Sequence, residues 1–109
     1  MITETAQPIT TIIPRTEFAV TPRAELERPY RVIIENDDVT PMEFVVLVLL
    51  TIFALEMERA NAVMFEAHEK GRAYVVTLPF EEAQERVTEA QTLARANKYP
   101  LSFYLEPED

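Results

Sequence analysis

Polar and apolar positions along the 109-residue chain follow two periods, one typical of strands and one typical of helices. Residues 30–34, 73–78 and 101–105 are rich in β-branched and aromatic side chains, which predicts three short strands. Residues 56–70 and 80–97 repeat apolar side chains at helical spacing, which predicts two helices. The repeated positions are Met57, Ala60, Met64 and Ala67 in the first helix, and Ala83, Val87, Ala90 and Ala94 in the second.

A further helix is predicted to begin near Thr40, although the apolar run of residues 44–55 could belong to a strand or a helix. Thr40 is a favourable N-cap residue, Pro41 suits the first helical position, and Glu43 completes a capping box with Thr40. These start signals favour the helix. The run is shorter than the roughly 20 residues that a membrane span needs, so no membrane association is expected.

Gly71, the only glycine, is predicted to end the helix of residues 56–70 in the left-handed conformation. The elements then follow the order β-α-α-β-α-β. This order predicts an α+β fold, a two-layer βααβαβ sandwich in which three helices pack on a small three-stranded antiparallel sheet. The domain is expected to span residues 29–109. Residues 1–28 contain three prolines and no sustained period, which predicts a flexible N-terminal arm.

Composition narrows the classes of function. The formal charge of -9 comes from 19 acidic and 10 basic residues, and no contiguous basic stripe could neutralise phosphates, so nucleic acid is not an expected partner. An acidic surface instead favours cationic ligands and basic protein patches. The chain has no cysteine, which excludes disulfides and thiolate chemistry. The first residues lack the features of a signal peptide, and we expect a cytoplasmic protein.

A short acidic loop and the only histidine supply candidate binding groups. Asn36, Asp37 and Asp38 precede a predicted helix start, and His68 lies near the end of the next predicted helix. Carboxylates, a carboxamide and a neutral imidazole accept hydrogen bonds, whereas an α-ammonium group offers only donors. The combination predicts a site for a small cation that carries an apolar side chain, as the free N-terminus of a peptide does.

The same residues have plainer interpretations that spacing alone leaves open. Asp37 and Asp38 are common turn residues, and His68 near a helix C-terminus favours the helix dipole. Catalysis is not expected, because Thr40 is the nearby hydroxyl and is predicted to cap a helix. A metal held by the two aspartates and the histidine would lack a fourth ligand, so neither a metal nor a cofactor is expected.

Taken together in this order, the segments resemble the ClpS family, the adaptors of the Clp protease, over about residues 30–105. The resemblance rests on Tyr-Arg-Val-Ile-Ile-Glu-Asn-Asp-Asp at 30–38, Thr-Pro-Met-Glu-Phe-Val at 40–45, His-Glu-Lys-Gly at 68–71 and Tyr-Pro-Leu at 99–101. It implies an adaptor without enzymatic activity. Such an adaptor binds the free N-terminal Leu, Phe, Tyr or Trp of N-degron proteins and delivers them to a Clp AAA+ unfoldase.

The resemblance also implies roles for individual residues. The α-amino group of the client would be bound by Asn36, Asp37 and His68. The pocket for its first side chain would be lined by Thr40, Met42, Val45, Met64, Ala67 and Leu101, with Met42 excluding β-branched side chains. The N-terminal domain of a Clp ATPase, of the ClpA or ClpC type, would contact Glu81 and Arg86.

Some positions depart from the family pattern. Val39 stands where an aromatic residue is frequent, and Ala67 stands where a larger aliphatic residue often packs, which predicts a wider pocket. Leu47 and Leu50 replace residues that are usually polar, which predicts a second exposed apolar face. The alternative function is therefore a non-enzymatic interaction module of the same fold that docks to another AAA+ protein or a ribosomal partner.

Overall fold

The computed structural model describes residues 22–108, and within them the predicted strands and helices are confirmed in order and in place. The elements are α1 (Arg23–Glu27), β3 (Pro29–Glu35), α2 (Met42–Thr51), α3 (Met57–Lys70), β4 (Arg72–Pro79), α4 (Phe80–Ala96) and β5 (Ser102–Pro107). Helix α1 was not expected from the sequence. Residues 1–21 of the predicted arm lie outside the described residues, and the division of the chain at residue 29 stays a prediction.

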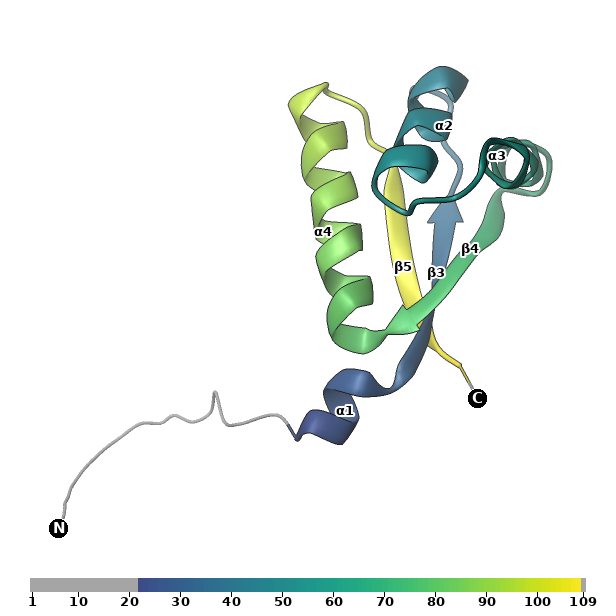
Figure 1. Ribbon diagram of the computed structural model, residues 1–109. Helices are drawn as coiled ribbons and strands as arrows, with labels where there is room; N and C mark the ends of the chain where they lie inside the picture. The colour runs from purple at the N-terminus through teal and green to yellow at the C-terminus, as the bar shows by residue number, and fades with distance from the viewer. Residues whose placement is uncertain (1–21, 109) are drawn as a thin grey trace, which may run out of the picture.

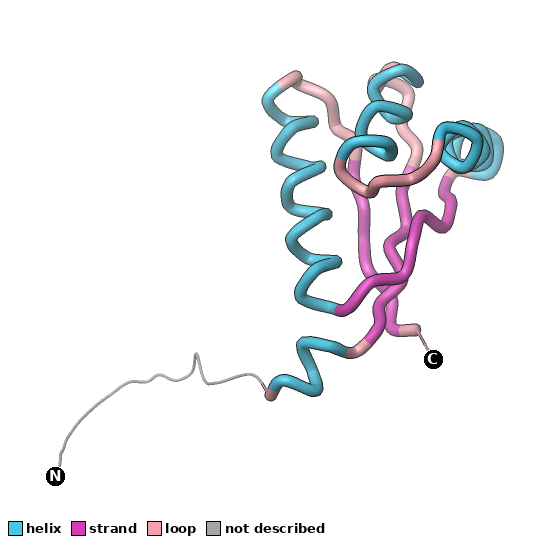
Figure 2. Tube along the Cα trace, viewed as in Figure 1, coloured by secondary structure: helices cyan, strands magenta, loops and turns pink. Residues whose placement is uncertain are grey.

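The sheet has the order β4-β3-β5, and both neighbours of the central strand β3 are antiparallel to it. A register shift lies between Val32 and Ile33 in the pairing with β4, whereas the pairing with β5 is regular from Tyr30 to Glu35. Figures 1 and 2 show α2, α3 and α4 gathered around the sheet, with α1 near the start of β3. The predicted two-layer α+β architecture is confirmed.

The hydrophobic core lies between the sheet and the three long helices. Val32 and Ile34 of β3 point to the same face and are almost fully buried. They pack in one cluster with Val48 and Leu49 of α2 and with three buried alanines of α4, at positions 83, 90 and 94. Small residues on α4 let this helix approach the sheet closely. Each large core side chain contributes about 1.5–3 kcal/mol through burial.

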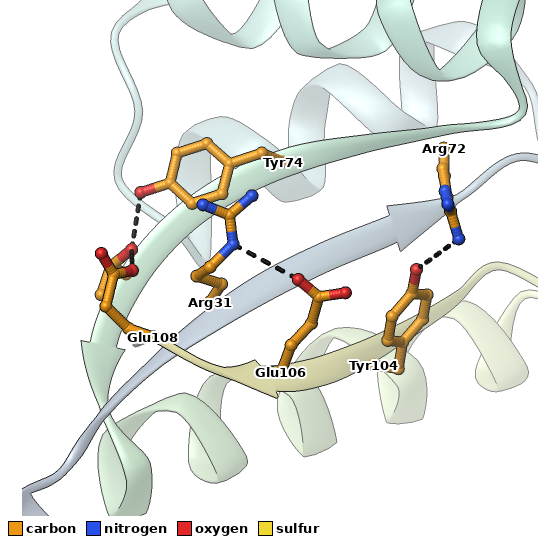
Figure 3. Close-up of polar contacts among 7 residues, drawn as sticks. Arg31, Arg72, Tyr74, Tyr104, Glu106 and Glu108 are labelled. Atoms are coloured by element: carbon orange, nitrogen blue, oxygen red, sulfur yellow. Dashed lines mark hydrogen bonds and ion pairs between the residues drawn. The ribbon is translucent and has the colours of Figure 1, made fainter.

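The opposite face of the sheet carries polar side chains instead of a second layer (Figure 3). Arg31 forms an ion pair with Glu106 at 3.3 Å, and its guanidinium lies 4.6 Å from the ring centre of Tyr74. Arg72 donates to the Tyr104 hydroxyl at 3.1 Å. Ile33 on this face is nevertheless only 5% exposed, and it lines a shallow hollow together with Arg31, Tyr74 and Tyr104.

The predicted capping box at Thr40 is wrong. Helix α2 begins at Met42 with Pro41 as its N-cap residue, and no side chain caps it. The N–H groups of Phe44 and Val45 donate to the carbonyl oxygen of Pro41. The Thr40 hydroxyl does not reach the helix because it donates to the carboxylate of Asp37 at 2.8 Å.

Two expectations about exposed apolar residues also need correction. Met57 shares the predicted stripe of α3 but is 56% exposed, because it is the first residue of the helix and projects beyond the core. Leu47 is exposed as expected, whereas Leu50 is half-buried and packs against the core. The second apolar face is therefore smaller than the sequence suggested.

Strand β4 continues into α4 without a connecting loop. Pro79 is both the last residue of β4 and the N-cap residue of α4. The Phe80 N–H donates to the Arg28 carbonyl oxygen at 2.8 Å, and the Phe80 ring lies 4.8 Å from that of Tyr30. The junction is thus fastened to the beginning of the sheet. None of the helices within residues 22–108 is long and apolar enough to cross a membrane.

Gly71 ends α3 as predicted, with φ of 90° in the left-handed region, and its N–H donates to the Ala67 carbonyl oxygen. A Cβ atom at this position would meet no atom within 4 Å.

We expect Gly71→Ala to lower the free energy of unfolding by about 1 kcal/mol through backbone strain, without a steric clash. Chemical denaturation checks this. Gly71→Asn should lose less, since Asn tolerates this conformation better, and equal losses would contradict the explanation.

Candidate functional site

A pocket of about 320 Å³ opens where β3 ends. Figure 1 shows that this end of β3 lies away from α1. Its walls come from the end of β3 and the loop after it, the first turn of α2, the C-terminal half of α3, and the residue before β5. The lining residues are Ile34, Glu35, Asn36, Asp37, Asp38, Val39, Thr40, Pro41, Met42, Val45, Met64, Ala67, His68 and Leu101.

The structure brings together every residue that the sequence assigned to the amine site and to the side-chain pocket. Five further lining residues were not assigned to either part of the site: Ile34, Glu35, Asp38, Val39 and Pro41. All lie within two positions of an assigned residue, and this closeness in sequence was the available signal. Glu81 and Arg86 lie elsewhere, on α4, whose residues do not line the pocket. The predicted contact for an ATPase is therefore a separate surface.

One backbone hydrogen bond places the loop beside α3. The Asn36 N–H donates to the Gly71 carbonyl oxygen at 2.9 Å, which extends the pairing of β3 with β4 by one residue beyond the strand. Gly71 also caps α3, three residues after His68. This connection helps to bring Asn36 and His68 into the lining of one pocket, although 31 other residues separate them in the sequence.

The Asp37 carboxylate holds the loop in a turn. Its Oδ1 atom accepts the N–H groups of Val39 at 2.8 Å and Thr40 at 2.7 Å, and its Oδ2 atom accepts the Thr40 hydroxyl. A carboxylate offers about four acceptor positions. Three are used within the loop, so one position on Oδ2 is left for a ligand.

These contacts also fix the charge of the loop. Burial raises the pKa of the Asp37 carboxyl, but the hydrogen bonds from Thr40 and from the Val39 N–H, together with the positive charge of Arg95, outweigh burial and hold the pKa below its usual value of 3.8. Asp37 is therefore ionised at neutral pH. The mouth of the pocket carries a negative charge that is held in place by the backbone.

The interior of the pocket is apolar. Val45, Met64, Ala67 and Leu101 are each at most 8% exposed and supply its walls. Met42 at the entrance is 40% exposed. Met42 and Met64 also line a neighbouring shallow hollow between α2 and α3, so the two methionines form a thin partition between the pocket and this hollow. Flexible thioether side chains let such a partition adapt to what the pocket holds.

The polar groups beside this interior are available to a ligand. Among the described residues, neither the Asn36 carboxamide nor the His68 ring is hydrogen-bonded to another protein group, and both side chains belong to exposed residues. Within residues 22–108, no three acidic or histidine side chains are grouped closely enough to hold a metal ion. The site therefore combines one carboxamide, one imidazole and one carboxylate position with an apolar cavity.

Comparison with known proteins agrees with this geometry. The family model of the ATP-dependent Clp protease adaptor protein ClpS matches residues 25–104. The chain belongs to the ClpS family. A ClpS 2 adaptor from Mesorhizobium japonicum is 40% identical over 102 residues, which cover 94% of this chain and 99% of the relative. A ClpS adaptor from Bdellovibrio bacteriovorus is 40% identical over 87 residues, covering 80% and 76% of the two chains.

A solved ClpS structure has the same fold. Agrobacterium tumefaciens ClpS2 bound to L-phenylalaninamide superposes with a TM-score of 0.72 at 38% sequence identity, and the match covers 75% of this chain and 99% of that chain. The ClpS family is an adaptor family of the Clp protease.

The turn around Asp37 leads to a stability prediction. We expect Asp37→Ala to lower the free energy of unfolding at pH 7 by about 1–2 kcal/mol, since three hydrogen bonds of the loop are lost. Because the pKa is lower in the folded state, this contribution is present above the usual carboxyl value of 3.8 and is lost as the pH falls through the lower folded value.

Denaturation curves of the wild type and the variant, recorded between pH 7 and pH 3, measure this difference. Asp38→Ala is the matched control, because the neighbouring Asp38 is exposed and makes no hydrogen bond to another described residue. Equal destabilisation by the two substitutions, or a difference that does not shrink in acid, would show that the Asp37 contacts do not support the loop.

Proposed function

We propose that this ClpS-family chain binds the free N-terminal residue of N-degron proteins and delivers them to a Clp AAA+ unfoldase, without catalysing a reaction itself. The preferred first residues are Leu, Phe, Tyr and Trp. The observation that supports this most directly is the adjacency of unengaged acceptors at Asn36 and His68 to a buried apolar cavity. A free N-terminal residue needs these two features side by side.

The α-ammonium group of the client has three N–H donors and no acceptor. In the proposed complex it donates to the Asn36 carboxamide oxygen and to a ring nitrogen of neutral His68. The third donor reaches the remaining acceptor position of Asp37, whose charge is maintained by the loop. An acylated N-terminus would lose the positive charge and two of the donors, and its acyl group would need space that the three acceptors occupy.

The ligand of the solved relative has this chemistry. L-phenylalaninamide carries a free α-ammonium group, a benzyl side chain and a carboxamide that imitates the next peptide bond. We infer that the same three parts are recognised by this chain, with the side chain between Met64, Ala67 and Leu101. Ala67 presents less bulk than the larger aliphatic residue that the family pattern often has here, which favours aromatic first residues.

Rough magnitudes are consistent with reversible binding. Charge-assisted hydrogen bonds contribute about 1.5–3 kcal/mol each, and burial of a Leu or Phe side chain contributes about 1.5–3 kcal/mol. Immobilising the peptide opposes these gains. A net binding free energy of about -8 kcal/mol corresponds to a Kd on the order of 1 μM. An adaptor must release its client to the unfoldase, and such an affinity allows it.

We propose that the outer face of α4 contacts the unfoldase. Glu81 is exposed, and Arg86 is partly exposed and lies between Glu82 at 3.5 Å and Glu89 at 3.7 Å. None of these residues lines the pocket, so the adaptor could hold a client and a Clp ATPase at the same time. The partner surface would have to offer cationic groups to an acidic helix face.

Acetylation of the client tests the recognition of the amine. Peptides that begin with Leu or Phe and differ only in N-terminal acetylation should differ in affinity by about 100-fold or more, since acetylation removes a charge and two donors. Isothermal titration or fluorescence anisotropy measures both peptides. Binding that is indifferent to acetylation would contradict the proposal and favour an interaction module with another kind of partner.

The role of His68 predicts an effect of its substitution. His68→Ala removes an acceptor for the client ammonium, and a charge-assisted hydrogen bond contributes about 1.5–3 kcal/mol. We expect the affinity for a Leu-headed peptide to fall about 10-fold or more.

His68→Gln keeps a side chain that can accept a hydrogen bond, so it should lose less affinity than His68→Ala. Titration of the same peptide into the wild type and both variants measures the difference. Equal affinities of the wild type and His68→Ala would exclude direct contact between His68 and the amine.

A further inference from the structure

Leu101 forms part of the pocket wall, but the ladder of hydrogen bonds between β3 and β5 begins only at the next residue. It is 1% exposed and immediately precedes β5, whose pairing with β3 begins at Ser102 opposite Glu35. The side chain faces the cavity together with Met64 and Ala67. The position of this wall therefore depends on what fixes the backbone of residues 97–101.

The connection from α4 to β5 is a tight turn. The Lys98 N–H donates to the Arg95 carbonyl oxygen and the Tyr99 N–H to the Ala94 carbonyl oxygen, which is the Schellman pattern at a helix end. Lys98 has φ of 65°, in the left-handed region where glycine is usual. The backbone hydrogen bonds of this turn do not involve the carbonyl groups of Tyr99 and Leu101.

Side chains of α4 make those contacts. The Nη1 atom of Arg95 donates to the Tyr99 carbonyl oxygen at 2.8 Å and to the Leu101 carbonyl oxygen at 2.9 Å. One turn earlier on the same helix, the Oε1 atom of Gln91 accepts the Phe103 N–H at 2.9 Å. Tyr99, Leu101 and Phe103 are alternate residues of an extended chain, so their backbone polar groups point to the same edge. Strand β5 is the last strand of the sheet on this side, and side chains of α4 form the hydrogen bonds that a further strand would form.

We infer that Arg95, on a helix that does not line the pocket, is a positioning residue that sets the place of the Leu101 wall and thereby the selectivity for the first residue of the client. The inference rests on the proposed function. The guanidinium holds the backbone on both sides of Pro100, and the Tyr99 ring packs edge-on against Phe44 of α2 at 4.9 Å. Helices α4 and α2 thus hold the wall from two directions.

The physical consequence is specific to the size of the bound side chain. When Arg95 is removed, Leu101 is free to move outward, and a Leu side chain in the pocket loses contacts that a larger ring keeps. The loss of affinity should therefore be greater for Leu-headed than for Trp-headed peptides. A contribution to overall stability alone would reduce the fraction of folded protein and leave the ratio of the two affinities unchanged.

The experiment compares free peptides headed by Leu, Phe and Trp with the full-length wild type and Arg95→Met, which keeps the stem and removes the donors. We expect the Trp to Leu affinity ratio to rise at least threefold. Arg95→Lys, which retains the charge and reaches one carbonyl oxygen at a time, should give a smaller rise. Arg23→Met removes an exposed arginine of α1, paired with Glu27 at 3.4 Å, and should leave the ratio unchanged.

A double-mutant cycle shows whether Arg95 acts through Leu101. Leu101→Ala should raise the same ratio, and adding Arg95→Met to it should raise the ratio no further. Wild-type binding with an unchanged ratio in Arg95→Met, or fully additive effects in the double variant, would overturn the inference and leave the proposed function intact. Failure of the wild type to bind any free peptide would instead overturn the proposed function.

Discussion

The site depends on the hydrogen bond from the Asn36 N–H to the Gly71 carbonyl oxygen. This bond continues the ladder of β3 and β4 by one step past the strand, at the place where α3 has just ended. A loop that left the sheet one residue earlier would separate the carboxamide from the imidazole. Gly71 makes the step possible, since its left-handed backbone both ends the helix and turns the chain into β4. Gly71 therefore contributes both to the fold and to the placement of the loop beside the pocket.

Asp37 illustrates how a charge that shapes a fold can remain available to a ligand. Its carboxylate uses three of its acceptor positions to shape the loop, and the same contacts keep it ionised. Sequence reasoning treated turn formation and amine binding as rival interpretations of this residue. The geometry makes them compatible, because the three contacts within the loop leave one acceptor position of the carboxylate unused.

Much of the fold could be predicted from local pattern, because strand and helix periods are properties of short segments. The strands, the three long helices and the cap at Gly71 were predicted on that basis. The predicted start of α2 was wrong, because the Thr40 hydroxyl had two possible partners. Only the folded loop shows that it donates to Asp37 and does not cap the helix. The resemblance located the pocket residues, whose roles stay predictions. It could not reveal Arg95, which acts on backbone groups and leaves no sequence signature at the pocket.

The direct passage of β4 into α4 has a mechanical consequence. Pro79 ends the strand and starts the helix, and Phe80 is bonded to Arg28 at the base of the central strand. No hinge separates the helix from the sheet at this junction. If a molecular motor pulls on the outer side of α4, we therefore expect the force to reach the whole sheet at once. The force would also reach the Leu101 wall of the pocket through Arg95.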